Sequence, residues 1–404
     1  MTCPAEKWGI DPGKFWMRGA APESPVRFDD ETGVWNVYGH AEAVQALGDP
    51  GTFSSDIARV LRMEGENPLQ EGNLLQLDPP RHRELRNLVS RAFTPKVVND
   101  LEPRIAELTA ELLEPLGDEF DLISALAHPL PVIVIAELLG VPAGDRAQFR
   151  TWADGLLTTE AEFNAREIDT ESDEAARQLR MVTEMRDYLL GHAAERRRRP
   201  RRDLLTDLVQ AEVDGERLSD DEIVNFASVL LLAGHITTTL LLGNTVLCLD
   251  EHPDQLAAVR DDRALLPSAI EESLRYLSPF AVVYRATTRA TEIGEREVPA
   301  DQVIAVRLSA ANWDARRFDS PATFDVHRDP NPHLGFGRGI HFCLGAPLAR
   351  LEGRIALGLL LDHFPQLSTD PRRPPTFMRS YDINGVNELP LLSGVRSRSA
   401  RGWT

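Results

Sequence analysis

Residue types suited to metal binding gather near the carboxyl-terminal end, in the stretch Phe336-Gly337-Arg338-Gly339-Ile340-His341-Phe342-Cys343-Leu344-Gly345. Three glycines there indicate that backbone without side chains passes close to something bulky. Apolar spacing after Pro347 predicts a helix, so Cys343 lies just before a helix amino terminus. The free N–H groups and the dipole at such an end favour a thiolate over a thiol. Cys343 is therefore expected to be a thiolate of the kind that ligates a haem iron.

The other cysteines have no such setting. Cys3 lies at the amino terminus, and Cys248 lies in an apolar segment where it is interpreted as a small core residue. This odd, sparse set predicts a reducing compartment and no disulfide framework. For Cys343 itself, the alternative is a structural cysteine in a glycine turn.

The loop around Cys343 resembles the haem-binding signature of the cytochrome P450 family at each characteristic position. The resemblance covers nearly the whole chain. It implies a heme b cofactor (iron protoporphyrin IX) ligated by Cys343, with Phe336, Gly337 and Gly345 in the cofactor-binding loop. It also implies a mainly α fold with a small β-rich portion, in which a long central distal helix faces a proximal cysteine loop.

Four residues match the positions at which this family binds the two haem propionates. His82 and Arg86 share one helix face at i and i+4, Arg285 follows Tyr284, and His341 stands two residues before the cysteine. Each residue alone would be interpreted as a solvated surface group. Charge-assisted hydrogen bonds to such carboxylates contribute about 1.5–3 kcal/mol each.

A second family feature is the pair in Glu272-Ser-Leu-Arg275, whose i, i+3 spacing places both side chains on one helix face. Exposed pairs of this kind are common and add little stability. The resemblance implies that this pair is buried and completed by Arg328, and that all three shape the proximal side.

The distal side is expected at Ala233-Gly234-His235-Ile236-Thr237-Thr238. The resemblance implies catalytic roles for Ala233, Gly234 and Thr237, through room for bound oxygen and help in proton delivery. Threonines in an apolar helix are otherwise interpreted as bonding back to carbonyls. Ile236 departs from the family pattern, which has an acid there. Three alternatives follow: ordered water held by His235, Thr238 or carbonyls, a proton-supplying substrate, or unusual chemistry.

The resemblance implies a monooxygenase that inserts one oxygen atom of O2 into a hydrophobic small molecule, by hydroxylation or epoxidation. Bacterial secondary-metabolite biosynthesis, of a polyketide or a peptide-derived compound, is the expected setting, with or without a carrier protein. The alternative is a haem-thiolate sensor without catalysis. Substrate contacts are expected from the segments 57–75, 152–163 and 383–386, and from Leu230, Ala233, Phe280, Val282, Val283 and Ile383.

Electrons must come from outside, because the 404 residues contain no flavin- or iron–sulfur-binding pattern. Ferredoxin and ferredoxin reductase are the expected partners. A basic docking patch beside the cysteine loop is predicted from Arg83, Arg91, Arg338, Arg350 and Arg354. The alternative is that these arginines are scattered surface charges.

The elements that must position these residues are mostly helical. Residues 81–275 carry helical spacing, whereas residues 284–308 and 386–391 favour strands. A hairpin is expected over residues 26–38 with its turn at Asp29–Gly33. No linker divides the sequence, so residues 1–404 are interpreted as one domain.

The segment from Ile223 to Leu249 carries no Asp, Glu, Lys or Arg and is long enough to span a bilayer. Its flanks are acidic and lack the positive residues that set membrane topology. Ser219-Asp-Asp-Glu222 is a capping box that starts a helix there. A long helix buried in a protein core is the favoured interpretation, so no membrane partner is expected.

The net charge of -19 argues against nucleic-acid or anionic-membrane partners. The basic run from Arg196 to Arg202 is interpreted as cations at a helix carboxyl end. The amino terminus has no apolar signal region, so a cytoplasmic location is expected. Lysine occurs only at positions 7, 14 and 96, which suggests a GC-rich bacterial genome.

Overall fold

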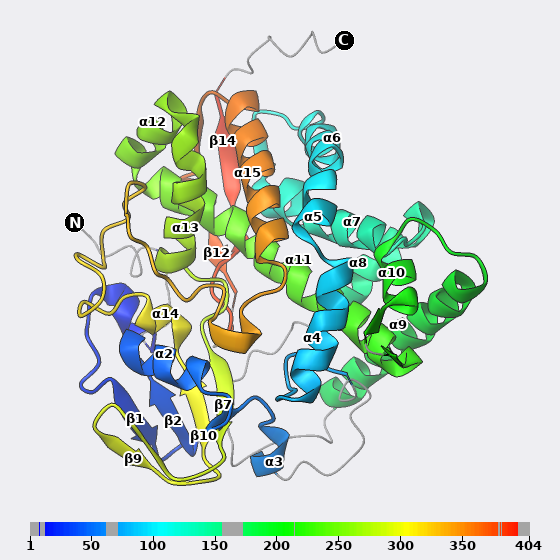
Figure 1. Ribbon diagram of the computed structural model, residues 1–404. Coiled ribbons are helices and arrows are strands. Elements are labelled where there is room, and N and C mark those ends of the chain that lie inside the picture. The colour runs from blue at the N-terminus through cyan, green and yellow to red at the C-terminus, as the bar shows by residue number, and fades with distance from the viewer. Residues whose placement is uncertain are drawn as a thin grey trace.

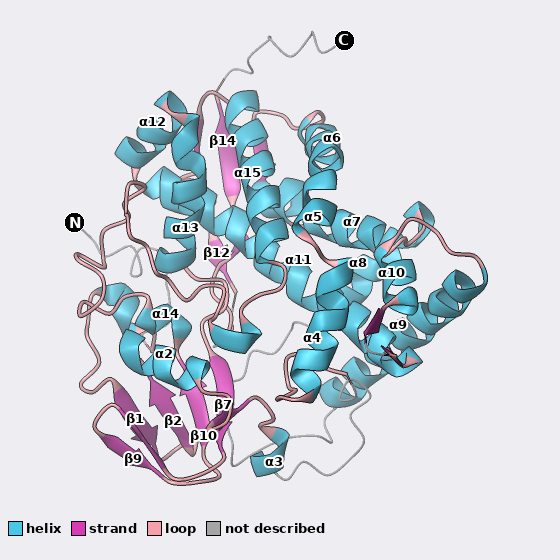
Figure 2. Ribbon diagram, in the orientation of Figure 1, coloured by secondary structure: helices cyan, strands magenta, loops and turns pink. Residues whose placement is uncertain are grey.

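The structure is a computed structural model that describes residues 8, 13–61, 72–155, 173–213, 215–378, 380 and 382–394. Helices fill most of the molecule, and the largest sheet lies at one corner of it (Figure 2). The helices are α2 His40–Gly48, α3 Ala58–Leu61, α4 Arg81–Ala92, α5 Pro95–Asp100, α6 Glu102–Leu113, α7 Pro129–Leu138, α8 Arg146–Gly155, α9 Asp173–Arg198, α10 Leu204–Gln210, α11 Asp220–Glu251, α12 Pro253–Asp261, α13 Leu266–Tyr276, α14 Leu308–Ala311 and α15 Ala346–His363. Short π or 3-10 turns are η1 Phe15–Arg18, η2 Ile123–Ala127, η3 Ala143–Asp145, η4 Arg263–Leu265 and η5 Gly339–His341.

The main sheet has the strand order β1-β2-β10-β7-β3 (Val26–Asp29, Val34–Val37, Val303–Val306, Val283–Thr287 and Phe53–Ser54). Only β2 and β10 pair in parallel. The predicted hairpin is β1–β2, and Gly33 in its turn has a φ of 71° that favours glycine. The smaller sheets contain β4 Glu119–Asp121, β5 Glu212–Val213, β6 Glu216–Arg217, β8 Thr291–Ile293, β9 Arg296–Val298, β11 Leu367–Thr369, β12 Thr376–Phe377, β13 Val386–Glu388 and β14 Pro390–Ser393. The expected mainly α fold with a small β-rich portion is confirmed.

Helix α11 runs through the middle of the molecule, behind α15 in Figure 1. The predicted capping box starts it: Ser219 Oγ accepts from the Glu222 amide, and the Glu222 carboxylate accepts from the Ser219 amide. It is long and apolar enough to cross a membrane, but 67% of its most apolar window is buried inside the protein. This agrees with the interpretation of a core helix.

The first turn of α11 is fixed by ion pairs to other helices. Its three consecutive acids are each bound by one arginine, in the pairs Asp220–Arg197, Asp221–Arg186 and Glu222–Arg81. Arg186 and Arg197 lie on α9, and Arg81 begins α4. Acids at a helix amino terminus also complement its dipole. The start of the central helix is therefore tied to α9 and α4.

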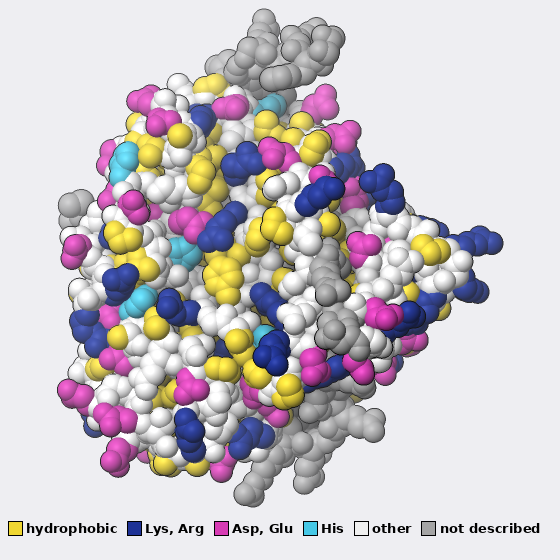
Figure 3. Space-filling view, viewed as in Figure 1, with side chains coloured by type: hydrophobic (Ala, Val, Ile, Leu, Met, Phe, Trp, Pro, Cys, Tyr) yellow, Lys and Arg dark blue, Asp and Glu magenta, His cyan; other side chains and the backbone are white. Residues whose placement is uncertain are grey.

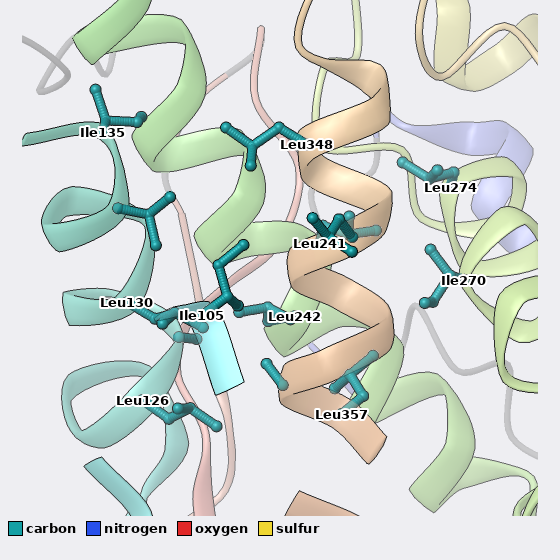
Figure 4. Packing of buried hydrophobic residues seen from close by; sticks show 14 of the residues in the cluster. Ile105, Leu126, Leu130, Ile135, Leu241, Leu242, Ile270, Leu274, Leu348 and Leu357 are labelled. Atoms are coloured by element: carbon teal, nitrogen blue, oxygen red, sulfur yellow. The ribbon is translucent and has the colours of Figure 1, made fainter. Parts of the chain in front are cut away.

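The main core packs around α11. Figure 4 shows Leu241 and Leu242 of α11 between Leu348 and Leu357 of α15 and the side chains of η2 and α7. Ile270 and Leu274 of α13 lie on the far side of α15 in the same view. This packing fixes two helices relative to each other: α11, which carries the distal segment 233–238, and α15, which follows the cysteine loop.

The basic run at the end of α9 has a structural role. Arg196 is fully buried, and its guanidinium donates to Asp203 (2.6 Å) and to the Gly140 carbonyl (2.7 Å). Arg197 and Arg201 form ion pairs with Asp220 and Glu195. The interpretation of this run as helix-end cations is confirmed.

Candidate active site

The cysteine loop is a tight turn that ends at the start of α15. The Cys343 amide donates to the Phe336 carbonyl at 2.9 Å, which closes the loop. Gly337 and Gly339 have φ values of 69° and 72°, a region that favours glycine. A Cβ on Gly339 would lie 2.4 Å from the Leu47 carbonyl oxygen, whereas one on Gly345 would lie 3.9 Å from Cys343 Sγ. The glycines thus serve backbone conformation and packing on α2, rather than only close approach to a bulky group as expected.

Burial and the helix end have opposite effects on the pKa of the Cys343 thiol. Burial raises the pKa of this thiol, and the Gly345 and Ala346 amides and the Arg86 guanidinium act against that rise. The amides at the helix end thus act in the direction that the sequence predicts, against the effect of burial. A bound cation is what would favour the ionised sulfur.

A buried carboxylate joins α13 to the segment that leads into the loop. Glu272 and Arg275 are both fully buried and form two bonds of 2.8 and 2.7 Å. Arg328 Nε lies 3.1 and 3.2 Å from the Glu272 oxygens, and Asn331 Nδ2 lies at 3.0 Å. Arg275 also donates to the carbonyls of Asn312, Pro321 and Thr323. The predicted structural role of Glu272, Arg275 and Arg328 agrees with this geometry.

The neighbouring Glu271 holds the loop from the other side. It receives two bonds of 2.7 Å from Arg350 of α15 and one of 3.0 Å from His333. The Arg350 guanidinium lies 4.5 Å from the centroid of the Phe336 ring. Phe336 is thus packed under a cation that is itself fixed, so the loop is rigidly placed.

The four expected propionate partners come together from three elements. The His82 ring on α4 lies 4.3 Å from the His341 ring in η5, between centroids. Arg86 donates to the Phe342 carbonyl at 2.7 Å, and His341 Nε2 lies 2.8 Å from Ser55 Oγ. Arg285 on β7 is 8% exposed, and its side chain donates to the Tyr284 carbonyl.

This cluster contains two arginines and is poorly solvated. Burial lowers the pKa of Arg285 to about 10, with nearby Asp78 opposing that shift. Burial, followed by the charges of Arg285, His82 and Arg86, lowers the pKa of His341 to about 3. Burial also lowers the pKa of His82 and of Arg86. Two guanidinium groups, those of Arg86 and Arg285, therefore stand beside two imidazoles whose charged form is disfavoured, and an anionic ligand would complete the cluster.

Two further residues of this cluster, Ser55 and Asp78, were not predicted from the sequence. Asp78 accepts from the Ser54 hydroxyl and from the Ser55 amide at 3.0 Å, which fixes Ser55 under His341. Asp78 stands just before the two prolines that precede α4. Its position four residues before His82 was the available signal.

One face of α11 remains partly open although the rest of its central portion is buried. The partly exposed residues are Val229, Leu230, Leu232, Ala233, Gly234, Ile236 and Thr237. At 100° per residue they share one side of the helix. Thr237 Oγ1 donates to the Ala233 carbonyl at 2.6 Å, so the back-bonding interpretation holds in this structure. Leu230, Ala233 and Thr237 thus lie together, as expected.

The structure shows two features of this helix that the sequence did not predict. His235 is fully buried with its ring 4.4 Å from that of His128, and Thr238 is 3% exposed, so neither faces the open side. A Cβ on Gly234 would lie 2.6 Å from Ile135 Cδ1. Gly234 is therefore small because α7 packs against it, rather than only to make room for oxygen.

The two segments expected to complete the pocket meet at Phe280 and Ile383. These residues form an isolated antiparallel bridge, and Phe280 is 37% exposed. Val283 is half-buried and packs on the same sheet face as Val306, whereas buried Val282 packs with Val34 and Val303 on the opposite face. Val282 and Val283 therefore point to opposite faces of the sheet.

The remaining expected contacts are only partly described. Trp152 is 3% exposed and packs against Phe149 and Tyr188, so it belongs to the core rather than to a pocket. Within the predicted segments 57–75 and 152–163, residues 62–71 and 156–163 lie outside the described residues. Leu75 is described and is 55% exposed.

Comparison with known proteins decides the family. The family model for cytochrome P450 matches residues 163–386. Cyclomarin C epoxidase CymV of Salinispora arenicola is 46% identical over 374 residues, covering 91% of this chain and 92% of that protein. The chain belongs to the cytochrome P450 family.

Two further P450 relatives extend the comparison. The erythromycin C-12 hydroxylase of Saccharopolyspora erythraea is 43% identical and covers 95% of both chains. The solved structure of the post-tailoring hydroxylase HmtN, involved in himastatin biosynthesis, has 55% identity and a TM-score of 0.86 over 98% of this chain and 100% of that one. The chain is thus a P450 monooxygenase, and the alternative of a non-catalytic sensor is set aside.

P450 enzymes bind haem b, and the residues described above fit this group. Cys343 would ligate the iron. The cluster of His82, Arg86, Arg285 and His341 would bind the two propionates, since Asp78 is the acid whose charge acts on both Arg285 and His82 among the described residues. The buried Nε2 of His82 has no hydrogen-bond partner among the described residues, which marks it as a site for such an oxygen.

Removing this cluster is expected to weaken haem retention. The double variant Arg285→Met/His341→Phe keeps side-chain bulk but loses two charge-assisted donors. Haem transfer to apomyoglobin should become roughly ten- to hundredfold faster, while the ferrous–carbonyl band stays in place. Arg289→Met, on an exposed arginine near β7, is the matched control. Equal transfer rates in all three proteins would exclude propionate binding by this pair.

Proposed function

We propose that this P450 hydroxylates or epoxidises a medium-sized hydrophobic secondary metabolite, such as a polyketide or a peptide-derived compound, in a bacterial cytoplasm. The observation that carries the proposal is the apolar lining. Leu230, Ala233 and Ile236 lie on the open face of α11, and Phe280 meets Ile383 across an isolated bridge. Relatives named as an epoxidase of cyclomarin C and a hydroxylase of erythromycin support this class of substrate.

When bound, thiolate-ligated haem supplies oxygen binding and activation with electrons from outside. The residues of this chain orient the substrate and move protons. The apolar pocket holds substrate and excludes water, and Thr237 supplies the hydroxyl on the open face of α11. Its proton is directed to the Ala233 carbonyl, so its oxygen lone pairs remain available to accept from water or a substrate group.

The proton that Thr237 helps to deliver does not come from an acid at position 236, because the side chain of Ile236 can neither carry a proton nor order a water molecule. His235 and Thr238 are buried away from the open face. We infer that the donor is a substrate hydroxyl or carboxyl, or water held by substrate and backbone carbonyls. Of the alternatives for proton delivery drawn from the sequence, this proposal leaves out water held by the side chains of His235 or Thr238.

Thr237→Ala is therefore expected to lower the product formed per NADPH by at least about twofold, with a matching rise in peroxide, because proton delivery loses its hydroxyl. Thr237→Ser keeps the hydroxyl and should retain most of the coupling. Ile236→Glu should be tolerated without a large gain. The product-to-NADPH ratio with the true substrate is the measurement, and a ratio unchanged by Thr237→Ala would rule out threonine-assisted delivery.

We further propose that electrons come from a ferredoxin and its reductase. The docking patch is weaker than expected from the sequence. Arg350 and Arg354 are neutralised by Glu271 and Glu102, and the side chain of Arg91 lies outside the described residues. Arg83 and Arg338 are exposed. On the face that carries α4 and α15, basic and acidic side chains are interspersed (Figure 3).

The rate of first electron transfer from a ferredoxin should fall with ionic strength, because exposed charges are screened within about 10 Å at 0.1 M. A fall of roughly threefold up to about 0.5 M is expected from so few free arginines. Arg83→Ala/Arg338→Ala should flatten this dependence, and Arg296→Ala on β9 should not. A salt-independent rate in the parent enzyme would contradict steering by these residues.

The function itself is tested by substrate-binding spectra. Biosynthetic intermediates of the polyketide and peptide classes, free and carrier-bound, are titrated into the haem-containing enzyme. Those that shift the haem spectrum are then turned over with NADPH and a ferredoxin pair. Oxygenated product from a hydrophobic intermediate is the expected result, whereas binding only of small polar compounds would refute the proposal.

A further inference from the structure

Lys14 is a buried cation near the amino terminus that binds a loop far along the chain. Lys14 is only 9% exposed. Its Nζ donates to the Ser380 carbonyl (3.0 Å), the Ile383 carbonyl (3.4 Å) and Asn384 Oδ1. The other lysine in the described residues, Lys96 on α5, is exposed. Burial of an ammonium is costly unless it is well bonded, so these contacts are specific.

The loop that Lys14 binds is the one that presents Ile383. The Asn384 amide donates to the Pro279 carbonyl and the Ala281 amide donates to the Asp382 carbonyl, both at 2.8 Å. The two strand-like segments 279–281 and 382–384 are thereby joined around the Phe280–Ile383 bridge. Any shift of this loop moves Ile383 relative to Phe280.

Side chains hold the same loop from other directions. Asn384 Nδ2 donates to Ser309 Oγ at 2.6 Å, and Asn244 of α11 donates to the Asn384 carbonyl at 3.2 Å. The Tyr284 hydroxyl donates to Asp382 Oδ1 at 2.8 Å. Asn384 is therefore fixed between Ser309 and Lys14, with its amide oxygen toward the ammonium.

The charge of Lys14 acts on this loop beyond the three bonds. Burial raises the pKa of Asp382, and the charges of Arg307 and Lys14 oppose that rise. A neutral apolar side chain at position 14 would fill the same space but leave two carbonyls and one amide oxygen without this donor. Buried acceptors that lose a charged donor carry a full desolvation cost.

We propose that Lys14 is a positioning residue for the substrate pocket. By fixing the Ile383 carbonyl and Asn384, it holds the Ile383 side chain against Phe280 and so determines which bulky ligands the pocket accepts. The amino-terminal segment thus contributes to substrate specificity without touching the substrate. This inference rests on the proposed function, in which Phe280 and Ile383 line the pocket.

The test compares two azole probes of different size on the haem-containing enzyme, imidazole and 4-phenylimidazole, by optical titration. Lys14→Met is expected to weaken 4-phenylimidazole binding about tenfold and to change imidazole binding less than about twofold, because only the larger probe needs an ordered pocket wall. Lys14→Arg, which keeps a buried donor and charge, should recover most of the difference. Lys96→Met is the matched control and should bind both probes as the parent does.

Equal changes for both probes, or no change for either, would overturn the proposal, because a merely structural lysine would not discriminate between them. If Lys14→Met does not fold, Ser309→Ala decides, since it loosens Asn384 from the other side. The same selective loss is expected there, and none would count against the proposal. Ile383→Ala and Phe280→Ala distinguish failure of the proposed pocket from failure of the Lys14 proposal. If these two variants bind 4-phenylimidazole as the parent does, Phe280 and Ile383 do not line the pocket. If they bind it more weakly but Lys14→Met does not, Lys14 has no positioning role.

Discussion

Replacing Cys343 by alanine is expected to abolish the thiolate-type Soret band of the ferrous–carbonyl complex and to reduce monooxygenase activity to the assay background. Cys343 is the cysteine in the loop that ends at the start of α15, where the Gly345 and Ala346 amides oppose the effect of burial on the pKa of its thiol. A haem iron without an axial thiolate loses the electron donation on which oxygen activation depends. The carbonyl-difference spectrum of purified protein is the measurement.

Cys248→Ala is the matched control for this variant. Cys248 is fully buried in α11, and burial raises the pKa of its thiol beyond the range in which it would ionise. Its replacement should leave the band and the activity in place. A Cys343→Ala protein that kept the thiolate-type band would show that another residue ligates the iron.

Replacing Glu272 by glutamine is expected to lower the free energy of unfolding by about 3–5 kcal/mol, because a buried ion pair that loses one partner leaves an uncompensated charge. Here two guanidinium groups, Arg275 and Arg328, would lose their shared carboxylate. Urea unfolding followed by circular dichroism, together with the haem content of the purified protein, measures the effect.

Glu271→Gln offers a control one residue away. Glu271 also binds an arginine and a histidine, but its side chain is 28% exposed and that of its partner Arg350 is 41% exposed. Pairs that reach solvent contribute less than buried ones, so this variant should lose clearly less free energy of unfolding than Glu272→Gln. Two variants with the same unfolding midpoint would mean that burial of the Glu272 cluster adds no stability.

The sequence was sufficient to predict what depends on local pattern. The capping box at Ser219, the β1–β2 hairpin and the grouping of His82, Arg86, Arg285 and His341 all follow from spacing together with the family resemblance. The buried Glu272–Arg275 pair was also expected, although its partners Asn331 and Asn312 were not. Spacing specifies which side chains share a face, but it does not specify the backbone groups that they will meet.

The features that the sequence did not predict have a common physical origin, because each concerns packing between elements distant in sequence. Gly234 packs against Ile135, ninety-nine positions away, and Val282 packs with Val34 and Val303 on the face of the sheet opposite to Val283. Arg350 carries a charge that Glu271 neutralises, so counting arginines overstated the basic patch. For Cys343, the helix-end amides were predictable, but the opposing effect of burial on the pKa of its thiol was not.

The division of α11 into an open and a closed side also limits how this enzyme can acquire new substrates. On the closed side, truncating a buried residue such as Leu231 or Leu242 costs about 2–5 kcal/mol, so most changes there are lost with the fold. Val229, Leu230, Ala233 and Ile236 are less constrained by packing. Tolerated variation in this helix should therefore recur every three or four residues, and a variant library confined to those four positions would explore substrate range with little loss of folded protein.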